Sequence, residues 1–117
     1  MAYNETLANR IREYFVDHLQ FNFEEKRMMG GLTFMLNGKM CVGVFKQDLM
    51  CRIDPEQHEQ AIEQNGCKTM EFNNRGMHGY VLVDEMVLNK KETFDYWMQL
   101  SIEFNPKAKA SKKKNKK

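Results

Sequence analysis

Residues 32–44 of the chain are LTFMLNGKMCVGV, in which two apolar runs flank the pair Asn37-Gly38. Every second residue of each run is apolar: Leu32, Phe34 and Leu36 in the first, then Met40, Val42 and Val44 in the second. A period of two is typical of a β-strand that buries one face. Asn-Gly between two such runs is a strong hairpin signal, because a type I′ turn needs positive φ at both central residues. The sequence therefore predicts an antiparallel hairpin at this point.

Further strands are expected on both sides of the hairpin. Residues 24–30 are predicted to form a short, charged edge strand that runs into a glycine-permitted bend at Gly30-Gly31. After the hairpin, residues 46–48 form a second tight connection. The next inward face consists of Leu49, Cys51 and Ile53. These segments together predict an antiparallel meander.

The second half of the chain predicts two more strands and the loop that joins them. The strands are expected at residues 67–72 and 80–83. Residues 73–79, Asn-Asn-Arg-Gly-Met-His-Gly, are predicted to be a loop because asparagine and glycine punctuate them. Arg75, Met77 and His78 of this loop are candidate interaction residues.

An amphipathic helix is expected over residues 4–20, with Asn4 as its N-cap. Its apolar side consists of Leu7, Ile11, Tyr14, Phe15, Val16 and Leu19. A second helix is predicted to open at Asp54-Pro55-Glu56, since a capping side chain, a proline and an acid favour a helix start. It is expected to run to about Asn65, and its polar composition places it on the surface, with His58, Ala61 and Ile62 on its inner edge.

The last helix is predicted to start in a capping box formed by residues 89–92, Asn-Lys-Lys-Glu. Its inner face is Phe94, Trp97, Met98, Ser101 and Phe104, and Pro106 ends it. The order of elements predicts an α+β fold: a single antiparallel sheet of about five to six strands, with the N- and C-terminal helices packed on it and one short surface helix. Residues 1–106 are expected to form one domain, and residues 107–117 a disordered lysine-rich tail.

The composition favours a single domain in the cytoplasm. A chain of 117 residues has the length of one domain, and its 42% hydrophobic content supports one core. No stretch approaches the roughly 20 apolar residues of a membrane span, and no secretory signal is visible at the start. Three cysteines without a C-x-x-C pair argue against a disulfide framework, so we expect buried thiols.

The net charge of +2 conceals an asymmetry. Residues 107–117 hold seven lysines and no acid, which leaves 11 basic against 16 acidic residues in the rest, a net charge of −5. The lysines are Lys107, Lys109, Lys112, Lys113, Lys114, Lys116 and Lys117. Such a segment can attract nucleic acid non-specifically through counterion release. Solubility, contact with the acidic body and no role at all are the alternatives.

The residues that could carry chemistry do not form a recognisable constellation. His18, His58 and His78 are at no metal-ligand spacing, and a zinc site normally needs four convergent ligands. No phosphate-binding glycine motif occurs. We therefore expect no metal, no cofactor and no catalytic residue. An unrecognised enzyme or small-ligand protein that pairs Cys41 or Cys51 with His78 stays open, since such partners need not be near in sequence.

Ten methionines are many for a chain of this length. Methionine suits adaptable binding surfaces, but its flexibility also makes it a filler of irregular cores. Core filling is the favoured interpretation.

Three segments together resemble the TfoX N-terminal domain family: RMMGGLTFMLNGKMCVGV from Arg27 to Val44, LMCRIDPE from Leu49 to Glu56, and the pair MEF and RGMHGYVLV from Met70 to Val83, followed by Trp97. The similarity extends over roughly residues 10–104, and the order and spacing of the glycines make it fairly specific. The resemblance implies an α+β fold. The best-known members are TfoX/Sxy regulators of natural competence, which act on transcription together with the cyclic-AMP receptor protein.

The resemblance implies a regulatory or interaction domain that is not an enzyme, and it supplies no catalytic residues. Full-length regulators of this kind carry a second, helical domain, where this sequence continues into lysines. A protein partner is therefore expected, and non-specific nucleic-acid binding through the tail is the alternative. A homodimer through the early edge strand, residues 24–29, is also conceivable, although charged residues in edge strands oppose such pairing.

Overall fold

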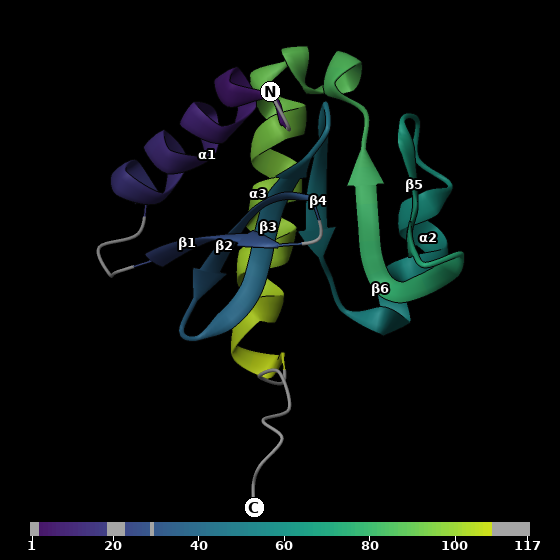
Figure 1. Ribbon diagram of the computed structural model, residues 1–117. Helices are drawn as coiled ribbons and strands as arrows, with labels where there is room; N and C mark the ends of the chain where they lie inside the picture. Colours follow the sequence, from purple (N-terminus) through teal and green to yellow (C-terminus); the bar gives the residue numbers. More distant parts are fainter. Residues whose placement is uncertain (1–2, 19–22, 29, 109–117) are drawn as a thin grey trace, which may run out of the picture.

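The computed structural model describes residues 3–18, 23–28 and 30–108, which form one open antiparallel sheet with helices on one face (Figure 1). The strands are β1 (Phe23–Met28), β2 (Gly31–Leu36), β3 (Lys39–Phe45), β4 (Asp48–Arg52), β5 (Cys67–Phe72) and β6 (Arg75–Val83), in the spatial order β1-β2-β3-β4-β6-β5. The helices are α1 (Glu5–His18), α2 (His58–Ile62) and α3 (Lys91–Phe104), with three short 3₁₀ turns, η1 (Pro55–Gln57), η2 (Glu85–Asn89) and η3 (Asn105–Lys107). The predicted α+β class, with a six-stranded sheet, is confirmed.

The hairpin of β2 and β3 forms as predicted, and a bulge changes which side chains it buries. Asn37 and Gly38 have φ values of 57° and 76°, as a type I′ turn requires. The register shifts between Phe34 and Met35, so Cys41 has no partner in the ladder. The expectation that Met40 shares a face with Val42 and Val44 is wrong, because the extra residue reverses the alternation.

The main core lies between the sheet and the helices. In Figure 1, α3 lies behind β3 and β4. The largest fully buried side chains here include Trp97, Phe15, Phe34 and Ile11, each at most 1% exposed. Burial of an aromatic or branched side chain of this kind contributes about 1.5–3 kcal/mol. The three cysteines lie in the same cluster, so the expectation of buried thiols is confirmed.

The opposite face of the sheet holds a second cluster, which consists of Met35, Met40, Met50, Met70 and Phe45. These side chains are between 0% and 9% exposed, although among the described residues no helix contributes to this cluster. We call it the methionine face. Most methionines of the strands therefore fill a core, as the composition indicates.

The methionine face is buried because the sheet curls. The turn at Gly30, next to one edge strand, lines the same hollow of about 290 Å³ as Lys68 and Met70 of the other edge strand, β5. The β2–β3 pair is closely packed on this face. A Cβ at Gly31 would lie 2.3 Å from the Val44 carbonyl oxygen and 3.0 Å from the Phe45 ring, and one at Gly43 would lie 3.2 Å from the same ring. The ring of Phe45 thus covers two glycines that have no room for a side chain.

Two predictions about loops and caps are wrong. Residues 73–79 are not a loop, since Asn73 and Asn74, with φ of 57° and 64°, make a tight turn and β6 begins at Arg75. Asn89 does not cap the last helix: Lys90 occupies the cap without a side-chain bond, because residues 85–89 are already in the turn η2. The side chain of Asp84 caps η2 instead, by accepting from the Met86 N–H.

The other helix predictions are confirmed in part. The side-chain oxygen of Asn4 accepts a hydrogen bond from the Leu7 N–H at 3.1 Å, as an N-cap does. Val16, expected on the apolar side, is 69% exposed, and Leu19 lies outside the described residues. The helix expected over residues 54–65 starts at Asp54, whose side chain accepts from the Glu56 N–H, but its first turn is 3₁₀ and α2 itself ends at Ile62.

Candidate interaction surfaces

The structure places the three predicted interaction residues, Arg75, Met77 and His78, on strand β6 rather than on a loop. Arg75 and His78 are exposed, whereas Met77 packs against the edge of the methionine face. His78 stacks on His58, with 4.6 Å between the ring centroids. The three side chains therefore belong to different surroundings, and they form no common site.

A large bulge in β6, opposite Met70 of β5, explains this arrangement. The ladder pairs Thr69 with Val81 and Glu71 with Gly76, so Met70 stands opposite residues 77–80. Gly79 lies inside the bulge with a φ of 88°, a conformation that favours glycine. The backbone of Gly79 is tied on both sides: its carbonyl accepts from the Ile53 N–H at 2.8 Å, and its N–H donates to His58.

His58 holds the bulge together, and it is 3% exposed. Its Nδ1 accepts a hydrogen bond from the Gly79 N–H at 2.8 Å, and its Nε2 lies 2.8 Å from the Thr69 hydroxyl. Because a backbone N–H only donates, Nδ1 carries no proton and the neutral ring holds its proton on Nε2. A proton on Nδ1 would face the Gly79 N–H and break this contact.

Burial lowers the pKa of His58, and the positive charge of a protonated His78 beside it lowers it further, against the smaller opposing effect of Glu59. In the unfolded chain a histidine titrates near pH ~6.5. Below that pH the unfolded state binds more protons than the folded state, so the free energy of unfolding falls with falling pH. The loss ends once the pH is below the folded pKa. Neutral His58 is thus a structural link between α2 and the sheet.

An open hollow of about 620 Å³ lies between η2, the first half of α3 and the residues that follow α2. Its apolar lining includes Met86, Val87, Tyr96 and Trp97, and its polar lining includes Gln64, Asn65, Lys90, Glu92 and Thr93. We call it the α3 groove. Met86 is 73% and Tyr96 is 45% exposed, and together with Val16 they are the exposed large hydrophobic side chains of the described residues.

The aromatic wall of the α3 groove is held in place. The amide of Gln64 donates to the Tyr96 hydroxyl at 3.0 Å, and the Tyr96 ring meets the Trp97 ring edge-on at 5.1 Å. Trp97 is 1% exposed and packs in the main core. The groove therefore offers rigid apolar surface with polar groups around it, which is typical of a binding hot spot. The sequence carries no signal for the α3 groove, because its residues come from three elements whose contacts depend on the tertiary fold.

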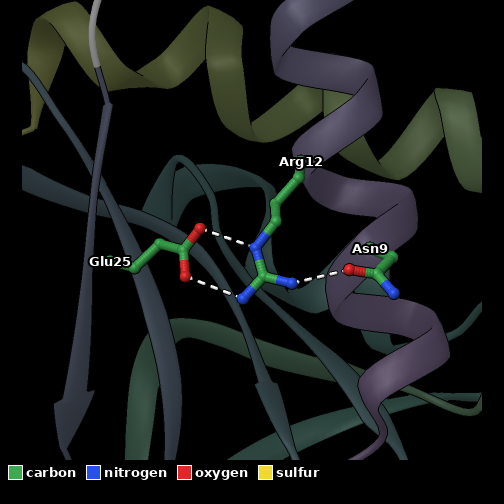
Figure 2. A network of polar contacts seen from close by, with 3 residues as sticks. All are labelled: Asn9, Arg12 and Glu25. Carbon is green, nitrogen blue, oxygen red and sulfur yellow. Dashed lines mark hydrogen bonds and ion pairs between the residues drawn. The ribbon is translucent and has the colours of Figure 1, made fainter.

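A third feature is the connection between the edge strand β1 and α1 (Figure 2). The Arg12 guanidinium donates from Nε and Nη2 to the two oxygens of Glu25, at 2.6 and 2.8 Å, and from Nη1 to the Asn9 side chain at 2.6 Å. The hydrogen bond to Arg12 lowers the pKa of Glu25, and the same bond raises the pKa of Arg12. Glu25 is therefore ionised and turned toward its own helix.

The thiols have the properties of core residues. Burial raises the pKa of Cys41 to about 12 and that of Cys67 to about 11, and it also raises the pKa of Cys51. The reactive form of cysteine is the thiolate, which is scarce at neutral pH when the pKa is raised. Within residues 3–18, 23–28 and 30–108, no group of three or more His, Cys, Asp or Glu side chains is placed to hold a metal ion.

Of the seven tail lysines, only Lys107 is described, and it is exposed. Lys109, Lys112, Lys113, Lys114, Lys116 and Lys117 lie outside the described residues. The chain just before them is attached to the sheet: the Asn105 side chain donates to the Leu36 carbonyl at 3.1 Å and accepts from the Asn37 side chain at 2.9 Å. Ala108 is buried. No described helix is long and apolar enough to cross a membrane.

A six-stranded antiparallel sheet with helices on one face, buried thiols and an open apolar groove define a small α+β domain. The model of the TfoX N-terminal domain matches residues 17–105, which is most of the chain, so the protein belongs to that family. The resemblance drawn from the glycine-rich segments is confirmed. No curated protein and no solved structure matches the chain.

We predict that His58→Gln makes the free energy of unfolding less dependent on pH. The wild-type protein should lose stability between pH 7 and pH 5 more steeply than this variant, because only the wild type must protonate a ring that folding holds neutral. Urea unfolding at a series of pH values measures both slopes. His78→Gln is the matched control, since it keeps both hydrogen bonds of His58 and should still lose stability in acid. Equal slopes for wild type and His58→Gln would contradict the assignment.

Proposed function

We propose that this protein is a non-enzymatic regulatory domain of the cytoplasm that binds a protein partner through the α3 groove. Membership of the TfoX N-terminal domain family supports, in coarse terms, a regulatory role of the competence type. In this proposal the regulation acts on transcription. The buried thiols with raised pKa values support a role without nucleophilic catalysis. The groove supplies a surface that such a role needs.

One observation carries the proposal: Met86 and Tyr96, two of the three exposed large hydrophobic residues in the described part of the chain, line the same hollow. Isolated apolar residues on a surface are ordinary, but a group of them beside a rigid aromatic wall marks an interaction site. The partner inserts an apolar side chain between Met86 and Tyr96, above Trp97. The polar residues around the hollow bind the partner's backbone and polar groups.

We predict that Met86→Ser and Tyr96→Ser each weaken partner binding by about 2 kcal/mol, roughly 30-fold, as the loss of a hot-spot residue does. Affinity capture at native abundance identifies the partner, and calorimetry with the purified partner measures the dissociation constants. Val16→Ser is the matched control, since it removes an equally exposed apolar side chain from α1, away from the groove. A partner that binds all three variants equally would refute the groove as the site.

The second candidate function is non-specific nucleic-acid binding by the tail, which the charge asymmetry favours. Seven lysines follow a body with a net charge of −5. Such binding weakens steeply with salt, because each neutralised phosphate releases counterions.

We predict that deleting residues 109–117, which removes six lysines and leaves the buried Ala108 in place, abolishes a salt-sensitive shift of a DNA duplex in a gel. When the logarithm of the binding constant of the full chain is plotted against the logarithm of the salt concentration, the slope should be negative, with about −0.9 for each phosphate contacted. The full chain with its lysines changed to glutamine is the matched control for chain length, and it should also fail to bind. Unchanged binding after the deletion would exclude this mechanism.

A further inference from the structure

We propose that β1 is a self-complementary edge that joins two copies of this chain in a two-fold symmetric dimer, with a continuous sheet across the interface. β1 pairs with β2 on one side and is the last strand of the sheet on the other. Figure 1 shows it at the edge opposite β5. Residues 24–27 are exposed, so the outer side of the strand is accessible within the described part of the chain.

An exposed edge strand can either pair with a second copy of itself or repel every other strand. The sequence of β1 decides between these two, and it is Phe-Glu-Glu-Lys-Arg-Met. Consider two antiparallel copies of β1 related by a two-fold axis perpendicular to the sheet. Residues that stand opposite one another across this interface have their side chains on the same face of the sheet. With the axis at Glu25, Glu24 of each copy stands opposite Lys26 of the other. The strand thus has an acid and a base two positions apart, so every pairing with itself about Glu25 makes two opposite-charge contacts.

The faces of the strand agree with this register. Phe23 packs on the main core and Glu25 bonds to α1, whereas Met28 packs on the methionine face. By alternation Glu24 and Lys26 project to the methionine side, to which no helix of the described residues contributes. The opposite-charge pairs therefore form on one face of the sheet, the side of the methionine face.

The like-charge pair at the axis is already compensated. Each Glu25 carboxylate holds two hydrogen bonds from its own Arg12, at 2.6 and 2.8 Å, and turns toward α1 (Figure 2). Arg27 of the second copy is the diagonal neighbour of Glu25 and adds a further positive charge on the same face. In the alternative register, with the axis at Lys26, Glu25 of each copy stands opposite Arg27 of the other, but Arg12 already neutralises Glu25, so this pair adds less. The two Lys26 ammonium groups meet at that axis, and no carboxylate is bound to Lys26 within the described residues. The Arg12–Glu25 pair therefore selects the first register.

Charged edge strands usually prevent association, because a random partner edge presents the wrong charges. In β1 the same charges favour pairing with β1 of a second copy over pairing with other strands. Each cross-strand opposite-charge pair contributes modestly, but reversing one partner replaces attraction with repulsion at two symmetric positions.

The test uses the full chain and two single variants, Glu24→Lys and Lys26→Glu. Sedimentation equilibrium of the wild type should show a mass that rises with concentration from 13.9 kDa toward twice that value, and that falls back in high salt. Each variant alone should dimerise at least about tenfold more weakly, since it places like charges opposite each other twice. An equimolar mixture of the two variants should regain wild-type affinity, because a heterodimer restores both opposite-charge pairs.

Lys68→Glu, on the other edge strand, is the matched control and should dimerise as the wild type does. Thermal unfolding of dilute protein checks that each variant is folded, and exposed substitutions of this kind should leave it nearly unchanged. A wild-type mass of 13.9 kDa at every concentration would overturn the proposal. So would a mixture no stronger than its components, or a Lys68→Glu variant as weak as Glu24→Lys, which would assign the interface to β5.

Discussion

The Phe45 ring lies against Gly31 and Gly43, and the packing of the sheet relies on this contact because neither position has room for a side chain. A side chain at either glycine would push the ring or the backbone away. β2 and β3 therefore approach this closely only because both positions are glycine. The methionine face beside this contact is buried although, among the described residues, no helix covers it. The helices are left to one face only, where they close the main core and form the α3 groove.

The curl also decides which surfaces remain for contact. On the methionine face the side chains of the strands pack against one another and are buried. The exposed methionine-rich binding surface that the composition suggests is therefore largely absent there. Met86 is the exception, since it lies in the turn η2 and is exposed beside Tyr96. At the margin of the sheet, β1 is held to α1 by the Arg12–Glu25 pair, which fixes the orientation of the edge. The α3 groove and the edge strand β1 are therefore the surfaces on which the two binding proposals rest.

Local signals in the sequence predicted the elements whose structure is local. Asn37-Gly38 fixes its hairpin through the backbone preferences of two residues, and Asp54 caps its turn through its own side chain. The bulges were not predictable in this way. The shift at Met35 leaves no mark in the alternation of residues, so Met40 was assigned to the wrong face. The bulge at Gly79 is bonded to His58, which is far along the chain, so residues 75–79 were wrongly assigned to a loop. Val16 was assigned to the apolar side of α1, but it follows Leu7 by nine residues, about half a turn out of phase, so it faces solvent. The α3 groove has no sequence signal, because it exists only where three elements meet.

The curled sheet buries the methionines of its own strands and leaves Met86 exposed. Limited oxidation with dilute peroxide, followed by peptide mass spectrometry, measures this difference, because the oxidation rate of methionine follows its exposure. In the folded protein Met86 should oxidise nearly as fast as in urea, whereas Met50 and Met70 should oxidise at least about tenfold more slowly. Equal rates for Met50, Met70 and Met86 in the folded protein would show that the methionine face is not a buried core.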